Sequence, residues 1–128
     1  MKKYDEAIKC YDKVINTNDD RFRSIACLNR GALKYELGDY PSALQDFRKI
    51  DYAKYKGQKY IDIGLCHYRL GWYEGAEKAY RNAMQVNSKL VEAYYNLAVI
   101  YNSENKRDKA NRNKTKLIKY LYYLSLGE

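Results

Sequence analysis

Side chains that could perform catalysis or bind a metal are few in this chain, and their spacing suits neither task. The single histidine, His67, has no acid or nucleophile placed to work with it, and the three cysteines, Cys10, Cys27 and Cys66, include no C-x-x-C pair. Disulfide frameworks and zinc sites both need cysteines in paired spacings. We therefore expect no catalytic residue, no metal and no cofactor, and we interpret these four side chains as packed residues of helices.

Other enzyme signatures are absent from the sequence as well. No glycine-rich phosphate loop follows a predicted strand, and the carboxylates Glu74 and Glu77 fall among lysines on one helix face, where they favour solubility. The sequence therefore predicts a protein that is not an enzyme. Any activity would belong to domains outside this chain.

Length and composition fit one globular domain. Of the 128 residues, 46% are hydrophobic and 31% are charged, an ordinary balance for a folded domain. No apolar run approaches the roughly 20 residues that a membrane-spanning helix needs, and Met1 is followed by charged residues instead of the apolar core of a secretory signal. We expect a cytoplasmic protein without a membrane span.

A basic run near the C-terminus supplies most of the net charge of +8. Against one acid, Asp108, it contains the cations Lys106, Arg107, Lys109, Arg112, Lys114, Lys116 and Lys119. Because no aromatic residues alternate with these cations and no nucleic-acid motif is present, we interpret the run as a solvated helix face and expect no nucleic-acid partner. Contact of this basic patch with nucleic acid or an acidic partner stays an alternative function, recognisable by binding that falls steeply with salt.

The elements that would position any binding residues repeat along the chain with a period of about 34 residues. Small residues recur at Ala7, Ala43, Ala76 and Ala110, with separations of 36, 33 and 34 residues. Gly31, Gly64 and Ala98 are 33 and 34 residues apart, and the turn glycines Gly38 and Gly71 are 33 apart. Self-similarity at this period, with two helices in each period, is typical of a helical solenoid whose units bury their apolar faces against neighbours.

Three copies of the repeat share one residue pattern. The strongest copy has Tyr60, Ile63, Gly64, His67, Ala76, Tyr80 and Ser88. The copy after it has Tyr94, Leu97, Ala98, Tyr101 and Ala110, with Lys114 where an aromatic residue is expected, and the copy before it has Cys27, Arg30, Gly31, Lys34, Tyr40, Ala43 and Phe47. Tyr4, Ala7, Tyr11 and Val14 fit a second helix whose first helix is missing. Over about residues 3 to 124, the chain resembles the tetratricopeptide repeat family.

The resemblance implies an all-α fold, a right-handed superhelix of antiparallel helix pairs. It divides a single domain, residues 1–128, into a leading half unit at 3–20 and units at about 24–56, 57–90 and 91–124. Helices are expected at about 3–16, 22–37, 41–54, 57–70, 74–87, 90–104 and 107–124. We interpret the missing first helix as a sign either that the chain is a fragment of a longer array or that another chain covers this end.

Local signals support these helix boundaries. Gly38 and Gly71 are expected to end helices in a left-handed conformation, which glycine adopts at little cost. Asp39 is expected to cap the next helix, and Pro41 falls in the first turn of that helix, where its missing N–H does no harm. The small residues at positions 31, 64 and 98 are expected at tight helix crossings.

In tetratricopeptide arrays the first helix of each unit lines a concave groove that holds a peptide or a helix. The resemblance assigns that role to Leu28, Asn29 and Tyr35 in the first full unit, Ile61, Asp62, Leu65, Tyr68 and Arg69 in the second, and Tyr95, Asn96, Val99 and Asn102 in the third, with Ile25, Ala32, Glu36, Gln58 and Glu92 beside them. Spacings of three and four residues place each set on one helix face. The function implied is a non-enzymatic protein–protein interaction module, an adaptor, scaffold or co-chaperone-like protein, whose partner is a protein or peptide.

One family binding mode does not fit this sequence. Some relatives hold the C-terminal carboxylate of acidic chaperone tails with Lys, Asn and Arg side chains. The matching positions here are Leu28, Ala32, Asp62, Glu92 and Asn96. Because bases are lost and acids have entered, we expect no clamp for acidic chaperone tails.

Both ends of the chain carry apolar stripes that indicate a further alternative, self-association or assembly as a homo-oligomer. The candidate residues are Ile8 and Tyr11 near the N-terminus and Leu121 and Tyr122 near the C-terminus. An uncovered apolar patch of this kind usually marks a partner surface.

Overall fold

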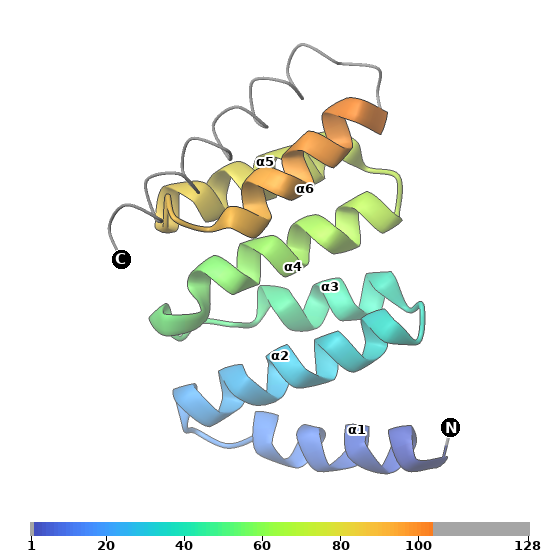
Figure 1. The fold of residues 1–128 in the computed structure, drawn as a ribbon. Helices are drawn as coiled ribbons and strands as arrows, with labels where there is room; N and C mark the ends of the chain where they lie inside the picture. The colour runs from blue at the N-terminus through green and yellow to red at the C-terminus, as the bar shows by residue number, and fades with distance from the viewer. Residues whose placement is uncertain (1, 104–128) are drawn as a thin grey trace, which may run out of the picture.

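The computed structural model describes residues 2–103, and the regular structure within that range is entirely helical. The elements are α1 (Lys2–Ile15), α2 (Asp20–Glu36), α3 (Tyr40–Arg48), η1 (Ala53–Tyr55), α4 (Lys56–Arg69), α5 (Tyr73–Val86) and α6 (Val91–Ser103), where η1 is a single 3₁₀ turn. Each helix packs against the next one in the chain, and α4 also contacts α6. Figure 1 shows the resulting stack, with α1 at one end. The predicted all-α fold of antiparallel helix pairs is confirmed, and the helix predicted at 107–124 lies outside the described residues.

Helices α2 and α4 end in the same way, one repeat apart. Gly38 and Gly71 have φ angles of 84° and 79°, the left-handed region that the sequence predicted for them. The N–H of Gly38 donates to the carbonyl oxygen of Tyr35, and the N–H of Gly71 donates to that of Tyr68, both at 3.0 Å. These bonds satisfy carbonyl groups that the helix end would otherwise leave unpaired, so both turns reverse the chain sharply into the next helix.

The start of α3 also follows the prediction. The Asp39 carboxylate accepts a hydrogen bond from the N–H of Ser42 at 3.3 Å, and Pro41 lies in the first turn. Both features stabilise a helix N-terminus, because they use or remove N–H groups that lack a partner inside the helix.

The end of α3 was predicted wrongly. We expected a helix to residue 54, but α3 ends at Arg48. The chain leaves the helix because Ile50 enters the core, where it is 1% exposed. The hydroxyl oxygen of Ser24 on α2 then accepts hydrogen bonds from the N–H groups of Asp51 and Tyr52, at 3.3 and 3.1 Å. These bonds hold the segment after α3 against α2.

Small residues lie where the helices of a pair cross, as predicted. A Cβ atom added at Gly31 would be 2.6 Å from the ring of Phe47, and one added at Gly64 would overlap the ring of Tyr80 in the same way. Ala98, at the next equivalent position, is also buried. The glycines therefore let an aromatic ring of the second helix pack closely against the backbone of the first.

A buried ion cluster joins the first three helices. Asp46 on α3 is 1% exposed, and its carboxylate is 2.6 Å from the guanidinium of Arg30 and 3.1 Å from the ammonium group of Lys34. Arg30 also contacts Asp12 on α1 at 2.5 Å. Arg30 and Lys34 stand where the family pattern has apolar and aromatic residues, and Asp46 supplies the opposite charge that lets them be buried.

Cys27, Cys66 and His67 are packed residues of helices, as the sequence indicated, whereas the same prediction was wrong for Cys10, which is exposed. Cys27 and Cys66 are buried, Cys10 on α1 is exposed, and burial raises the pKa of the Cys66 thiol to about 12. The His67 ring packs against Trp72, with ring centroids 5.5 Å apart. Burial, and to a smaller extent the nearby Arg48, lowers the pKa of His67. Cys27, Cys66 and His67 therefore contribute to the packing of the helices.

Within residues 2–103, no helix combines the length and the apolar character needed to cross a membrane. No group of three or more His, Cys, Asp or Glu side chains in that range is arranged to hold a metal ion.

Candidate peptide-binding groove

Side chains from α2, α3 and α4 enclose a small hollow on one face of the stack. It has a volume of about 210 Å³ and is lined by Ala32, Tyr35, Glu36, Phe47, Asp62 and Leu65. Phe47 reaches this position from α3 because Gly31 leaves room for its ring. Three residues predicted to face a groove, Tyr35, Asp62 and Leu65, are therefore neighbours. We call this feature the α2–α4 hollow.

Tyr35 forms a firmly held wall of the hollow. Its hydroxyl accepts a hydrogen bond at 2.9 Å from Nε of Arg69, which lies one repeat further on α4. Its ring meets the ring of Tyr40 edge to face, with centroids 5.1 Å apart. Because these contacts come from two other segments, the position of Tyr35 is set before any ligand arrives.

Asp62 on α4 is the acidic residue of that helix among those that line the hollow. Its Oδ1 accepts a hydrogen bond at 2.9 Å from the side-chain amide of Gln58, one turn earlier on α4. Burial raises the pKa of Asp62 to about 6, the Gln58 hydrogen bond opposes this shift, and the charge of Glu92 on α6 adds to it. Glu36 adds a second, exposed carboxylate at the edge of the same hollow. Two acidic residues, Asp62 and Glu36, therefore line the hollow.

Helix α6 presents the third set of predicted groove residues. Tyr95 is 60% exposed, the most exposed large hydrophobic side chain among residues 2–103. Asn102 is exposed, whereas Asn96 and Val99 are half-buried. The side-chain nitrogen of Asn96 is buried and has no hydrogen-bond partner within the described part of the chain. An exposed tyrosine beside polar side chains is the composition found in many recognition surfaces.

The structure excludes one predicted groove residue. Ile61 is 0% exposed and packs in the core with Ala76, Tyr80, Ala93 and Leu97, so its assignment as a peptide contact was wrong. Successive residues of a helix point about 100° apart, and only Asp62 of this adjacent pair can reach the hollow. Leu28 and Tyr68 are half-buried against the core, while Asn29 is exposed.

Sequence reasoning missed Phe47 as part of the site. The sequence identified it only as the aromatic residue of its repeat, equivalent to Tyr80 in the next unit, and both side chains are buried. The available signal was spacing, because Gly31 and Phe47 are separated by the same interval as Gly64 and Tyr80. That spacing predicts contact between the two residues, but it does not indicate that the edge of the Phe47 ring lines a hollow.

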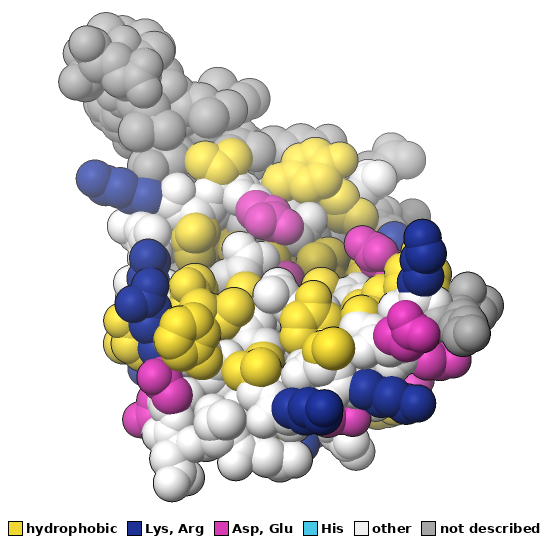
Figure 2. All heavy atoms as spheres, turned by 90° about the horizontal axis from the view of Figure 1, so that it is seen from below, with side chains coloured by type: hydrophobic (Ala, Val, Ile, Leu, Met, Phe, Trp, Pro, Cys, Tyr) yellow, Lys and Arg dark blue, Asp and Glu magenta, His cyan; other side chains and the backbone are white. Residues whose placement is uncertain are grey.

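The α1 end of the stack has an apolar surface of its own. Ile8 and Tyr11 are half-buried on α1, and Tyr4 is 43% exposed. Figure 2 looks onto this end and shows hydrophobic side chains gathered across it, with basic and acidic side chains around the edge. The other two residues predicted for self-association, Leu121 and Tyr122, lie outside the described residues.

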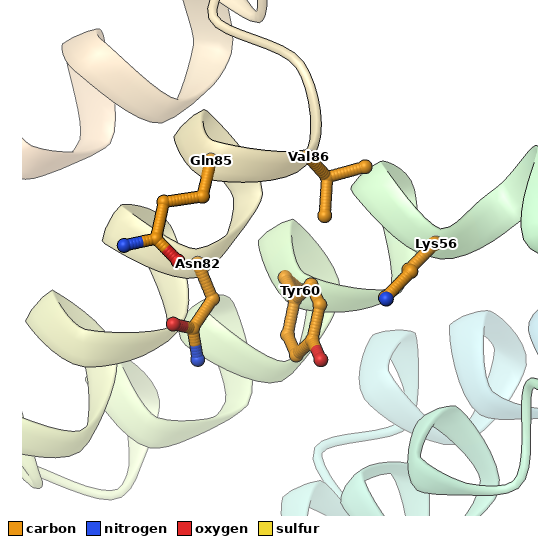
Figure 3. Close-up of a pocket in the computed structure, with 5 residues that line it drawn as sticks. All are labelled: Lys56, Tyr60, Asn82, Gln85 and Val86. Carbon is orange, nitrogen blue, oxygen red and sulfur yellow. The ribbon is translucent and has the colours of Figure 1, made fainter.

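A second depression lies between the start of α4 and the end of α5. Lys56 and Tyr60 line it from α4, and Asn82, Gln85 and Val86 line it from α5, as Figure 3 shows. Its volume is about 380 Å³. The two amides and the lysine point along an open surface, so nothing in this arrangement favours one ligand chemistry.

Antiparallel helix pairs that recur at a fixed period and stack on their neighbours define a helical repeat solenoid. Tetratricopeptide repeat models match two separate parts of this chain. A family model described as TPR repeat matches residues 64–103, and a second one, described as Tetratricopeptide repeat, matches residues 1–21. The chain is also 28% identical over 125 residues to TPR repeat-containing protein MJ1428 of Methanocaldococcus jannaschii. That match covers 97% of this chain and 22% of the relative, so the chain spans about a fifth of its length.

Solved structures of other tetratricopeptide repeat proteins share the fold. A crystal structure of MamA matches with a TM-score of 0.78 at 24% identity and covers 91% of this chain and 68% of that chain. MamA 41-end from Desulfovibrio magneticus RS-1 matches with a TM-score of 0.79 at 18% identity and covers 94% and 68%. The second TPR of Spaghetti (RPAP3), bound to the HSP90 peptide SRMEEVD, matches with a TM-score of 0.68 at 17% identity and covers 76% and 91%. At these identities the likeness establishes the fold.

Proposed function

We propose that this chain is a non-enzymatic protein–protein interaction module that binds a peptide or a helix across α2, α4 and α6. The α2–α4 hollow carries the proposal, because Tyr35, Asp62 and Leu65 from two different helices meet there beside Phe47. A preformed surface binds with little loss of side-chain entropy. An adaptor or scaffold role follows from such a surface.

Tyr95 is the side chain we expect to contribute most to affinity on the α6 part of the groove. Aromatic anchors dominate the energetics of many interfaces, and Tyr95 exposes 60% of its surface in the absence of a partner. The polar neighbours Asn96 and Asn102 would then set the orientation of the bound chain.

The acidic peptide bound by the second TPR of Spaghetti is not the ligand we propose for this chain. At the positions where carboxylate-binding relatives carry bases and amides, this chain has Leu28, Ala32, Asp62, Glu92 and Asn96. The carboxylates would repel an acidic tail. We therefore expect no measurable binding of SRMEEVD in a fluorescence anisotropy titration.

A selection from a random peptide library tests the proposed groove. Peptides enriched on the immobilised chain are synthesised, and their affinities are measured by calorimetry. Tyr95→Ala is expected to weaken binding at least about tenfold, whereas Tyr4→Ala, a matched change of an exposed tyrosine on α1, leaves it unchanged. Enriched peptides that bind both variants as well as the wild type would place the interface elsewhere.

Self-association through the α1 end is the second candidate function. The observation in its favour is the apolar surface of α1, where Tyr4 is exposed and Ile8 and Tyr11 are half-buried. Light scattering over a range of concentrations tests it. A dimer that Tyr4→Lys converts to a monomer, with the helical circular dichroism spectrum unchanged, supports the second candidate, and a wild-type monomer contradicts it.

The cytoplasmic location stays a prediction from the sequence. So does the absence of a nucleic-acid partner, because the basic run at 106–119 lies outside the described residues.

A further inference from the structure

The α2–α4 hollow has the size of a receptor for one side chain. Its volume of about 210 Å³ is below the roughly 300 Å³ at which pockets for drug-sized ligands begin. Its walls are apolar at Phe47, Leu65 and Ala32, whereas Asp62 and Glu36 bring carboxylates to it. A long side chain with an aliphatic stem and a polar end matches such a lining.

Asp62 differs from the buried Asp46 in its partners. Asp46 is paired with Arg30 and Lys34, at 2.6 and 3.1 Å. Within residues 2–103, no Lys or Arg nitrogen lies within ion-pairing distance of Asp62, and its carboxylate accepts a hydrogen bond from the neutral amide of Gln58. A half-buried carboxylate without a cation is energetically costly, so a partner that brings a cation would relieve that cost.

The surroundings of Asp62 add negative charge. Glu36 lines the same hollow from α2, and Glu92 of α6 is close enough to raise the pKa of Asp62 further. The nearby Arg69 uses its Nε to donate to the hydroxyl of Tyr35. In a chain with a net charge of +8, three acidic residues, Asp62, Glu36 and Glu92, therefore lie at or near the hollow, with Arg69 as the nearby cation.

We propose that the α2–α4 hollow receives a lysine or arginine side chain of a basic peptide. Its aliphatic stem packs on Phe47 and Leu65, and its charged end pairs with Asp62 and Glu36. The inference rests on the proposed peptide-binding function and names the chemical class of the peptide. It reverses the charge of the ligand held by relatives that bind acidic tails.

Parallel selections from a random peptide library test this inference. The wild type is expected to enrich peptides containing Lys or Arg, and Asp62→Asn is expected to lose that enrichment. Asp5→Asn, an exposed change on α1 that alters the net charge equally, should keep it. Asp62→Asn retains an acceptor for the Gln58 hydrogen bond, so the variant remains folded, and circular dichroism verifies this.

A matched pair of peptides then separates charge from apolar contact. The best enriched peptide is synthesised with its critical Lys or Arg and again with norleucine, which keeps an aliphatic stem and lacks the charge. We expect the charged form to bind at least about tenfold more tightly to the wild type, and the difference to shrink to less than about threefold in Asp62→Asn.

The two proposals fail in different ways. Enrichment of neutral or acidic peptides whose binding Tyr95→Ala weakens would overturn the basic-peptide inference and leave groove binding standing. Equal affinity of the charged and norleucine peptides for the wild type would also overturn the inference. If the wild type enriches no peptide at all, the proposed function fails and the inference fails with it.

Discussion

Asp62 makes the stability of the folded chain depend on pH. Its pKa is about 6 in the folded chain because burial disfavours the ionised form, whereas the ordinary value is 3.8. Between these two values the folded state binds more protons than the unfolded state, so stability falls as the pH rises from about 4 to about 6. The carboxyl group interacts with Gln58 and Cys66 on α4, Tyr80 on α5 and Glu92 on α6, and none of them is a cation.

We predict that Asp62→Asn stabilises the chain at neutral pH. The amide removes the cost of a desolvated charge while keeping an acceptor for Gln58, so the free energy of unfolding should rise by roughly 1–3 kcal/mol at pH 7. The gain should disappear at about pH 4, where the wild-type carboxyl group is protonated when folded. Urea unfolding at both pH values measures the difference, and a variant that is less stable than the wild type at pH 7 would contradict the burial argument.

For Asp51, the dependence of stability on pH has the opposite sign. The hydrogen bond from Arg23, followed by that from Ser24, lowers the pKa of Asp51. When the pKa of a carboxyl group is lower in the folded state than in the unfolded state, its ionised form stabilises the folded chain. This stabilisation is complete above the pKa of the unfolded state and is lost as the pH falls through the pKa of the folded state. Asp51→Asn should therefore destabilise the chain at pH 7, by a small amount because the site is exposed. The same urea measurements test the sign.

At the scale of helix pairs, the packing of α4 against α5 depends on Gly64, which has no side chain. Gly64→Ala should destabilise the chain by about 1–3 kcal/mol, because its Cβ would overlap the buried ring of Tyr80. Thermal unfolding measures the loss. The change should cost less in a Tyr80→Leu background, where the ring is gone, and an equal cost in both backgrounds would show that ring contact is not the cause.

The contact between α1 and α2 depends in part on Arg30. Arg30 joins Asp12 of α1 to the buried Asp46 of α3. Arg30→Met should destabilise the chain by about 3–5 kcal/mol, because among residues 2–103 it leaves the buried Asp46 paired with Lys34 alone. Asp12→Ala removes only the half-exposed partner, so its cost should be below about 1 kcal/mol. Urea unfolding measures the free energy of unfolding of both variants. Similar losses in Arg30→Met and Asp12→Ala would contradict the larger role given to the buried pair.

The spacing of small and aromatic residues predicted the helix pairs, but it did not predict every boundary or every face. Glycines at 38 and 71 marked the turns because their backbone requirement is local. The end of α3 depends on Ser24, far away in sequence, accepting hydrogen bonds from Asp51 and Tyr52. Ile61 was placed on the wrong face of α4, because alignment to a family pattern does not distinguish the directions of two adjacent helix residues. The pairing of Arg30 with Asp46 likewise needs tertiary contact, which one sequence does not reveal.

For the molecule as a whole, the contacts run mainly between neighbouring helices. Each helix touches the next, and α4 also contacts α6, so stability is approximately a sum over adjacent interfaces. In such an array the binding of a ligand stabilises the helices that it bridges, and the effect weakens with distance along the stack. Amide exchange along the chain therefore reports which surface a ligand uses.

We predict that an enriched basic peptide will slow amide hydrogen exchange most in α2 and α4, and less in α1. Tyr35 of α2 and Asp62 and Leu65 of α4 line the hollow. A bound side chain adds contacts to both helices, and these contacts are broken when either helix unfolds locally. Exchange followed by mass spectrometry, with and without saturating peptide, measures the change. Asp62→Asn should abolish the protection, because the peptide no longer finds its counter-charge. Protection confined to α1 would instead assign the peptide to the apolar end of the stack, where Tyr4 is exposed.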